Sequence, residues 1–409
     1  MKILHTSDWH LGQVLYNYNR SEEQANFFEQ LTAIVAQEKP DALVVSGDIY
    51  HTSLPTVGNQ KMYTDGVLSL HEAHPEMQIV ITAGNHDGRS RLEIDSPLWS
   101  HFKVSVIGNL QYTEDGRIDY DRHIVRVTNS AGAVAGYIAA VPFEYPQNFP
   151  MEGDEPKEDR QRAFFSRLLA RVGTLNEEGL PVVLMAHLTI TGCDVTGHDD
   201  GIAGIGGLER TDVGSLGRGY DYLALGHIHR PQNIPGDALA RYCGSPIPVS
   251  FDENYEHSVT VVEMEKGMKP AVRTIAIKNL LPLLTVPETP KPFEEALQAL
   301  ANLPKEQKGY LRVNVLIGDG NLPGNCNERI LEAVRDKNIR FCYINRNVEE
   351  AGTEQKRVEY GVDEVQSKSP LDIAEQYYRE TYQREMGDEL KSMMADVVKD
   401  TLKKNHQTM

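Results

Sequence analysis

The chain has 409 residues, of which 40% are hydrophobic and 24% are charged, and its formal net charge is −18. This composition excludes wholesale disorder, and the length corresponds to two or three domains of roughly 150 residues. No apolar run approaches the ~18 residues of a membrane-spanning helix, no signal-peptide core occurs, and the few scattered cysteines exclude a disulfide framework. We therefore expect a cytoplasmic protein with no membrane contact, and the negative charge disfavours a broad basic surface for nucleic acid.

Short apolar runs alternate with helical patterns over the first 280 residues. The runs are Ile3–Leu4, Ala42–Val45, Ile79–Ile81, Val182–Met185 and Tyr222–Leu225. They are rich in β-branched residues, which is typical of strands buried on both faces. The sequence SEEQ at 21–24 predicts a capping box that begins a helix, and residues 57–73 also have helical spacing. This alternation predicts an α/β fold, and strand-like segments within 104–142 predict mixed β-sheets flanked by helices.

A second pattern begins at about residue 281. Helical spacing over Phe293–Leu300 and Asn327–Asp336 alternates with strand-like spacing at 311–317 and over Ile339–Asn345. We therefore predict that residues 1–280 and a small α/β unit, residues 281–346, are separate domains. Residues 347–368 are polar and lack apolar periodicity, which predicts a linker.

Residues 369–409 form the last predicted segment. The sequence SPLD at 369–372 is a helix-start signal, and two amphipathic helices separated by Gly387 follow. These helices either fold back on the body of the chain or dock on a partner, for which tyrosine and methionine are favoured contact residues. The candidate partner-binding residues are Tyr377, Tyr378, Tyr382, Leu390, Met394 and Val398.

Five segments that follow predicted strands carry imidazole, carboxylate or carboxamide groups. They are Asp8-Trp9-His10, Gly47-Asp48-Ile49-Tyr50-His51, Gly84-Asn85-His86-Asp87, Ala186-His187 and Gly226-His227-Ile228-His229. Loops that leave the carboxyl ends of strands in an open α/β sheet converge on one crevice, so these groups can meet. One such segment alone is weak evidence, since a loop histidine is often merely solvated, but composition does not explain five in order.

These segments supply seven candidate metal ligands. They are Asp8, His10, Asp48, Asn85, His187, His227 and His229. Seven ligands suffice for two divalent ions if one carboxylate bridges, and Asp48 is the natural bridge because its two oxygens can each face a cation. Two ions ~3.5–4 Å apart can hold a phosphate and lower the pKa of the water between them. The imidazole-rich set favours manganese, iron or zinc over magnesium.

Together the five segments resemble the calcineurin-like metallophosphoesterase superfamily, whose pattern is DxH, GDxx, GNHD/E, a lone H and GHxH. The resemblance covers residues 1 to about 250 and implies the layered metallophosphoesterase fold. It implies one ion held by Asp8, His10, Asp48 and His229, and a second held by Asp48, Asn85, His187 and His227. Many members have an aspartate three residues after the bridging carboxylate, whereas this chain has His51.

Three longer segments resemble the SbcD family within that superfamily. They are KILHTSDWHLG near the start of the chain, LALGHIHRPQ and RYCGSPIPVSFDE. The resemblance implies a nuclease with manganese at its site, a capping domain at 281–346, and C-terminal helices that bind an SbcC-type ATPase. The implied activity is exonuclease on double-stranded DNA ends and endonuclease at hairpins. The implied assembly is a heterotetramer containing a homodimer. Predicted helices at 57–73 and 90–101 either form this dimer or pack on the sheet, and the resemblance favours the dimer.

Three further residues have candidate catalytic roles. The resemblance implies that His86 donates a proton to the leaving oxygen or stabilises the transition state, and the unperturbed imidazole pKa suits donation near neutrality. Asp87 either orients that ring or caps the next turn, and His51 either contacts the phosphate or positions the substrate strand. The glycine-rich stretch 196–219 predicts a loop that flanks the site.

Two other functions stay open on the sequence. A small-molecule phosphodiesterase or phosphatase of the same fold would use the same ligands, but would have no use for a capping domain and terminal helices. An inactive scaffold for the ATPase is disfavoured because all seven candidate ligands and His86 are present. No Walker A pattern occurs in the chain, so any ATP dependence must come from another subunit.

Overall fold

The computed structural model describes residues 1–196, 210–317 and 322–348. It also describes eight further residues: Glu375, Tyr378, Arg379, Met386, Gly387, Leu390, Lys391 and Met393. The chain divides into two compact units, Met1–Val348 and Glu349–Met409. Most of the predicted linker and of the predicted C-terminal helices therefore lies outside the described residues.

The first sheet has six strands in the order β16-β15-β1-β4-β5-β6. Their bounds are β1 Lys2–Thr6, β4 Ala42–Ser46, β5 Gln78–Thr82, β6 Val104–Ile107, β15 Ser258–Glu263 and β16 Ala271–Ala276. Strands β1, β4, β5 and β6 run parallel to one another, whereas β15 pairs antiparallel with β1 and β16 pairs antiparallel with β15. Helices α1 (Ser21–Glu38) and α2 (Val57–Ala73) pack on one face, where Phe27 and Val67 share a hydrophobic cluster with Val45. This parallel core confirms the predicted strand–helix alternation.

The second sheet also has six strands, in the order β13-β14-β12-β9-β8-β7. Their bounds are β7 Ile124–Thr128, β8 Val134–Ala140, β9 Val182–His187, β12 Tyr222–Gly226, β13 Gln232–Ile234 and β14 Asp237–Tyr242. Helix α5 (Arg160–Leu175) covers one face, where Phe164 and Leu168 pack with Leu184. The edge pairs β7–β8 and β13–β14 are antiparallel and the inner pairs parallel, so both sheets are mixed as predicted.

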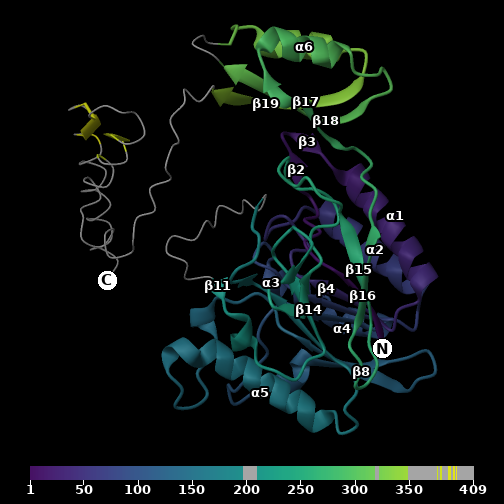
Figure 1. The fold of residues 1–409 in the computed structure, drawn as a ribbon. Coiled ribbons are helices and arrows are strands. Elements are labelled where there is room, and N and C mark those ends of the chain that lie inside the picture. The colour runs from purple at the N-terminus through teal and green to yellow at the C-terminus, as the bar shows by residue number, and fades with distance from the viewer. Residues whose placement is uncertain are drawn as a thin grey trace. The chain divides into compact units, whose positions relative to one another are not determined.

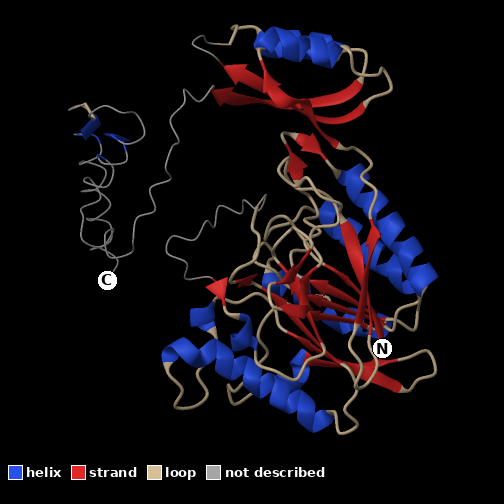
Figure 2. Ribbon diagram, in the orientation of Figure 1, coloured by secondary structure: helices blue, strands red, loops and turns tan. Residues whose placement is uncertain are grey.

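The two sheets face each other. Val44 and Val80 of the first sheet share one fully buried cluster with Val183 and Tyr222 of the second. The result is four layers, helices outside and two sheets inside, which Figure 2 shows in blue and red. Strands buried on both faces need apolar side chains at every position, which explains the near-continuous apolar runs. The predicted α/β class is confirmed, although the apolar runs did not indicate a division into two sheets.

A third, smaller sheet follows in the chain and is labelled in Figure 1. It consists of β17 (Leu283–Lys291), β18 (Lys308–Ile317) and β19 (Asn338–Val348), all parallel. Helices α6 (Phe293–Ala301) and α7 (Cys326–Ala333) connect the strands and share a separate hydrophobic cluster with them. The predicted helices and strands of this segment are confirmed within a few residues, and β19 extends into the predicted linker.

Two local predictions near the first sheet are wrong. Helix α1 begins at Ser21 after Arg20 as the N-cap, and no side chain caps it, so the predicted capping box does not form. The predicted helix at 90–101 is broken into α3 (Arg89–Glu93) and α4 (Ser96–Trp99). The helix break has a local cause, because Pro97 lies in the first turn of α4 and cannot continue the helix that precedes it.

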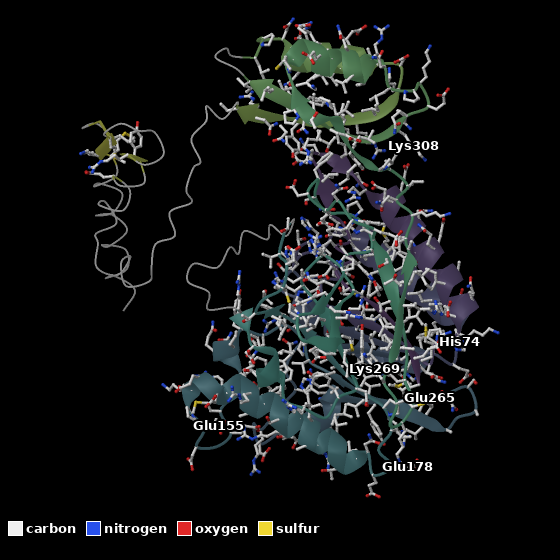
Figure 3. The ribbon with its side chains drawn as sticks, in the orientation of Figure 1. His74, Glu155, Glu178, Glu265, Lys269 and Lys308 are labelled. Atoms are coloured by element: carbon white, nitrogen blue, oxygen red, sulfur yellow. The ribbon has the colours of Figure 1, made fainter. Side chains whose placement is uncertain are left out.

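Many charged side chains are exposed to solvent, although several, such as Arg20 and Asp48, are buried. Figure 3 shows the exposed side chains of Glu178, Glu265, Lys269 and Lys308.

The remaining strands form two short pairs. Strand β2 (Val14–Leu15) pairs with β3 (Tyr18–Asn19), and β10 (Thr189–Ile190) pairs with β11 (Arg210–Thr211). Within the described ranges, no helix is both long enough and apolar enough to cross a membrane.

Candidate metal centre

The predicted ligands lie at the carboxyl ends of five strands, β1, β4 and β5 of the first sheet and β9 and β12 of the second. Four of them have positive backbone φ angles: Asp8 (54°), His10 (45°), Asp48 (53°) and His227 (97°). Such angles are uncommon for residues with a side chain and cost about 1–3 kcal/mol each, so they persist only where surrounding contacts impose them. The backbone N–H of Asp8 donates to Gly47 O at 3.0 Å, and that of His10 to Asp48 O at 3.0 Å.

Glycine is required beside these ligands for two different reasons. Gly47 has a φ of +87°, which lets the chain turn sharply as it leaves β4. A Cβ at Gly84 would lie 2.1 Å from Asp48 Oδ1, so here glycine permits a close approach.

One group of possible ligands combines the two sheets. Ligand atoms of Asp8, His10 and His229 all lie within 4.8 Å of one another, and all three residues are buried. The Nε2 atoms of His10 and His229 are 3.0 Å apart. Ligand atoms about 2.0–2.2 Å from a common ion are separated by about this distance, so the arrangement fits a cation.

The second group lies around Asn85. Ligand atoms of Asp48, His187 and His227 fall within 4.8 Å of one another. The Oδ1 atom of Asn85 is 3.0 Å from His187 Nε2 and 3.1 Å from His227 Nδ1. Four nitrogen and oxygen atoms therefore converge here.

Asp48 lies between the two groups. Its Oδ2 atom is 3.3 Å from His187 Nε2 and 3.8 Å from His10 Nε2, and Oδ1 accepts from His86 N at 2.9 Å. Oδ2 is fully buried and has no hydrogen bond among the described residues. Burial would raise the pKa of Asp48, but the adjacent His187 and His10 hold it well below its usual range. A buried, ionised and unsatisfied oxygen between two ligand groups fits a bridging ligand of two cations.

Two of the histidines have a fixed tautomer. The Nδ1 atom of His187 donates to the carbonyl oxygen of Ser46 at 2.7 Å, and Nδ1 of His229 lies 3.1 Å from Glu253 Oε1. Because a carbonyl or carboxylate oxygen accepts, Nδ1 of each ring carries a proton, and Nε2 presents a lone pair when the ring is neutral. Burial lowers the pKa of His187, but the charges of Asp48 and Asp8 raise it to about 9 in the metal-free centre, so a cation that binds this ring displaces a proton from Nε2. The site thus attracts positive charge.

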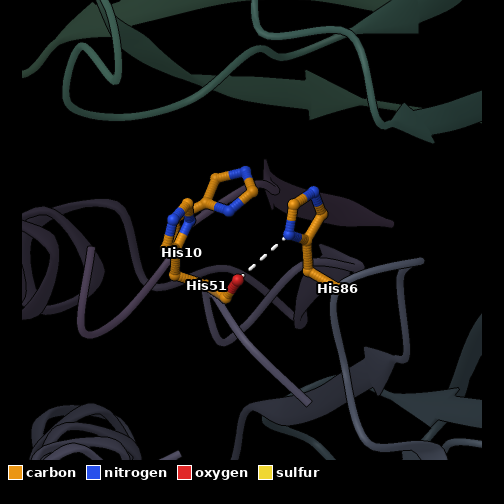
Figure 4. A group of neighbouring side chains, drawn as sticks. All are labelled: His10, His51 and His86. Atoms are coloured by element: carbon orange, nitrogen blue, oxygen red, sulfur yellow. Dashed lines mark hydrogen bonds between the residues drawn. The ribbon is translucent and has the colours of Figure 1, made fainter. Parts of the chain in front are cut away.

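The candidate catalytic residues lie beside the first ligand group. Figure 4 shows the rings of His10, His51 and His86 together, with His86 Nδ1 hydrogen-bonded to the carbonyl oxygen of His51 at 3.0 Å. The rings of His51 and His86 stack at 5.6 Å between centroids. Asp87 accepts from Ile49 N, Tyr50 N and Gly84 N at 2.8–3.1 Å. None of these bonds caps the next turn, since α3 (Arg89–Glu93) has no side-chain cap, so that prediction is wrong, and the ring-orienting role stays a prediction.

Asp87 also has a raised pKa. Burial, together with the negative charge of Asp48, raises the pKa of this carboxyl to about 6. The hydrogen bonds that Asp87 accepts from three backbone N–H groups oppose this rise, because they favour the ionised carboxylate. Through these three hydrogen bonds, Asp87 links the loops that follow β4 and β5.

Comparisons with known proteins agree with this geometry. The calcineurin-like phosphoesterase family matches residues 1–231, and the type 5 capsule protein repressor C-terminal domain, named for SbcD, matches residues 280–382. The SbcD subunit of the SbcCD nuclease of Rhodobacter capsulatus is 34% identical over 74% of this chain and 76% of its own length. Its Bacillus subtilis counterpart is 31% identical over 69% and 71%. The Escherichia coli counterpart is 31% identical over 64% and 65%.

The chain belongs to the SbcD family of calcineurin-like phosphoesterases. The predicted resemblance is thus confirmed. The family motif RYCGSPIPVSFDE ends on Glu253, which the structure places against His229, although no pattern in the sequence assigned this glutamate a role.

The sequence also missed the role of Gln24 in this SbcD-family chain. Its Oε1 atom accepts from Gly12 N at 3.1 Å, and its Nε2 atom donates to His10 O at 3.0 Å. The side chain thus holds the loop that carries Asp8 and His10. The sequence did not indicate these hydrogen bonds, because a glutamine at the N3 position is also a helix-start signal and was assigned to the predicted capping box.

Two groups of predicted residues are only partly described. Residues 197–209 of the predicted loop lie outside the described residues, and the segments that flank them pair as β10 and β11. The predicted partner-binding residues Tyr377, Tyr382, Met394 and Val398 also lie outside them. Tyr378 and Leu390 are helical, and Leu390 is 39% exposed.

Proposed function

We propose that this chain is the nuclease subunit of an SbcCD-type complex, which hydrolyses DNA phosphodiesters at double-stranded ends and at hairpins. The convergence of seven nitrogen and oxygen ligands in two groups, with the buried and unsatisfied Oδ2 of Asp48 between them, carries this proposal in a member of the SbcD family. Phosphodiester hydrolysis is the chemistry that two adjacent cations at such a site support.

Divalent metal ions follow from the family and the site, and we assign two, with manganese as the proposed metal. Asp8, His10 and His229 would hold one ion, Asn85, His187 and His227 the other, and Asp48 both. When bound, such ions neutralise phosphate charge and lower the pKa of water. The imidazole ligands fit a borderline metal such as manganese better than magnesium.

His86 is the residue that we assign to the leaving group. The His51 carbonyl fixes a proton on His86 Nδ1, so Nε2 is the atom that can gain a second proton and donate it to the departing oxygen. The stacked His51 ring restricts where the His86 ring can turn. His51 lies beside His10 and His86, and its contact with the phosphate stays a prediction. For Asp87 the hydrogen bonds support the role of linking the two loops, and the ring-orienting role stays a prediction.

The proposed partners are an SbcC-type ATPase and a second copy of the chain. The ATPase would bind the C-terminal helices, including Tyr378 and Leu390, and supply the ATP site for which this sequence has no Walker A pattern. Val57, Ile94 and Leu98 on or beside α2 and α4 are 82%, 73% and 64% exposed, and exposed apolar side chains of this kind support a homodimer formed through these helices. A cytoplasmic location and the domain boundaries 1–280 and 281–346 also stay proposals.

The net charge of −18 needs an explanation in a DNA-binding protein. Two divalent ions add about four positive charges at the site, and the ATPase could make most of the phosphate contacts. We therefore expect the isolated subunit to bind duplex DNA weakly. Tight binding by the isolated chain, with a steep dependence on salt, would contradict this explanation.

A cleavage assay tests the proposed function. The purified protein is incubated with Mn²⁺ and an end-labelled linear duplex or hairpin, with and without an SbcC-type ATPase, and with a chelator as the control. We expect cleavage that needs Mn²⁺ and increases with the ATPase and ATP. Hydrolysis of a chromogenic diester without any cleavage of DNA would instead favour the small-molecule phosphodiesterase.

A further inference from the structure

The loop between β14 and β15 brings a buried carboxylate to the metal centre. Glu253 is 5% exposed, and its Oε1 atom lies 3.1 Å from Nδ1 of His229. Its other oxygen, Oε2, accepts from Ser245 Oγ at 3.1 Å and from Val249 N at 3.2 Å. Both carboxylate oxygens are therefore engaged, one by the ligand histidine and the other by the loop itself.

We propose that Glu253 is a positioning residue that sets the tautomer and ring orientation of His229, and thereby the affinity of one of the two metal sites. This inference rests on the proposed metal centre. With its proton on Nδ1 directed at Glu253, His229 presents the lone pair of Nε2 toward His10 Nε2, 3.0 Å away. A carboxylate behind a ligand histidine fixes the ring and increases its basicity.

The position of Glu253 is itself set by contacts on both sides of its loop. Arg20, which is 1% exposed, donates to the carbonyl oxygen of Pro248 at 2.5 Å, and Gln13 Nε2 donates to Val249 O at 2.8 Å. These bonds tie the loop to the segment that follows β1, which also carries Asp8 and His10. One hydrogen-bond network thus holds both the segment that carries Asp8 and His10 and the loop whose Glu253 bonds to His229.

The small sheet contacts the other side of the same loop. Arg312 of β18 forms a 2.7 Å ion pair with Asp252, the neighbour of Glu253, and Phe251 packs in a cluster with Tyr310. The hydroxyl of Tyr310 donates to Glu23 at 2.6 Å, and Glu23 in turn pairs with Arg20. Glu253 therefore occupies a loop whose backbone is fixed by the first sheet, by α1 and by the small sheet.

The substitution E253Q separates a positioning role from a packing role, because it keeps the shape and replaces one acceptor by a donor. The amide NH₂ must face either His229 Nδ1–H or Val249 N–H, and both are donors. If it faces His229, the ring favours the other tautomer, which places a proton on Nε2, the ligand atom. If it faces Val249, the amide oxygen still accepts from Nδ1–H, but the negative charge that increases the basicity of the His229 ring is lost, so metal binding weakens in either orientation.

Calorimetric titration of chelator-treated protein with MnCl₂ measures this effect without any assay of cleavage. For E253Q we expect one of two binding steps to weaken about 10- to 100-fold while the other is unchanged. The matched control is E93Q, since Glu93 also accepts from backbone N–H groups, those of Gly108 and Asn109, but bonds to no proposed ligand among the described residues. E93Q should bind Mn²⁺ as the wild type does.

Equal Mn²⁺ affinities of folded E253Q and wild type would overturn the proposal, whatever the thermal stability of the variant. If E253Q does not fold, the histidine ¹⁵N shifts of the metal-free wild type decide instead. A His229 protonated on Nδ1 supports the proposal, and one protonated on Nε2 overturns it. A wild type that binds two ions but cleaves no DNA would refute the proposed nuclease and leave the role of Glu253 intact.

Discussion

The first sheet has a core of parallel strands, β1, β4, β5 and β6, and the small sheet is wholly parallel, but the two differ at the carboxyl ends of these strands. Strands β1, β4 and β5 lead into Asp8, Asp48 and Asn85, whereas β17, β18 and β19 end at Lys291, Ile317 and Val348. Every possible metal-binding group among the described residues belongs to the two large sheets. Parallel topology thus creates an edge where loops gather, but the side chains on those loops decide whether the edge is a site.

The second difference concerns what lies opposite each sheet. The first sheet is faced by the second, which supplies His187, His227 and His229 to the same centre. The inner strands are buried on both faces, whereas most residues of β19 are only half-buried. A complete ligand set therefore depends on two sheets meeting. We expect substitutions at the centre to change chemistry, and substitutions in the small sheet to change stability.

The largest effect is expected for Asp48→Ala. Because Asp48 serves both proposed ions, its loss should reduce bound Mn²⁺ from two ions to one or none and lower cleavage by about 10⁴-fold or more. Metal analysis after dialysis and the duplex cleavage assay measure the two results. Asp65→Ala, at an exposed residue of α2, is the control. An active Asp48→Ala protein would refute the two-ion site, and a wild type as inactive as the variant would favour the scaffold.

His86→Ala should separate catalysis from metal binding. Alanine keeps the backbone N–H that donates to Asp48, so both ions should stay bound, whereas loss of the imidazole should slow cleavage by about 10²- to 10⁴-fold. Single-turnover cleavage and metal content are compared with those of His101→Ala, at an exposed histidine. Unchanged cleavage would remove His86 from the mechanism, and loss of metal would make it a ligand.

Leu300→Ala tests the small sheet. This side chain is fully buried between α6 and the strands, so its truncation should destabilise the sheet by about 2–5 kcal/mol. Hydrogen exchange should show faster exchange in β17–β19 and unchanged protection in β1, β4 and β5. Leu331→Ala, at a side chain that is 51% exposed, should change stability by less than about 0.5 kcal/mol. A loss of Mn²⁺ binding in Leu300→Ala would show that the two regions are not independent.

Tyr310→Phe should have the smallest effect, because it removes one hydrogen bond between the small sheet and α1. The hydroxyl donates to Glu23 and accepts from Arg340 at 2.8 Å, so we expect a loss of about 1–2 kcal/mol of unfolding free energy. Urea denaturation measures it beside Tyr137→Phe, whose exposed hydroxyl donates to Leu175 O. A loss well above this range would mean that the contact between the small sheet and α1 contributes more to the free energy of unfolding than this hydrogen bond accounts for.

Much of the site could be predicted from the sequence because its signals are local. Each strand is a short apolar run, and each ligand follows such a run within a few residues, so position in the chain predicts position at the sheet edge. The α/β class and the elements of the small sheet were predictable for the same reason. The capping box at 21–24 failed because Gln24, a helix-start residue by pattern, instead bonds to Gly12 and His10.

The sequence by itself determined which groups can bind metal, the order in which they follow the strands, and membership of the SbcD family. Only the tertiary structure decided that the strands divide into two facing sheets, since a fully apolar run looks the same in either sheet. It also decided that Glu253 meets His229, and that His10 Nε2 lies 3.0 Å from a nitrogen 219 residues away. The physical reason is that strand and helix patterns depend on near neighbours in sequence, whereas ligand distances and tautomers depend on how distant segments pack.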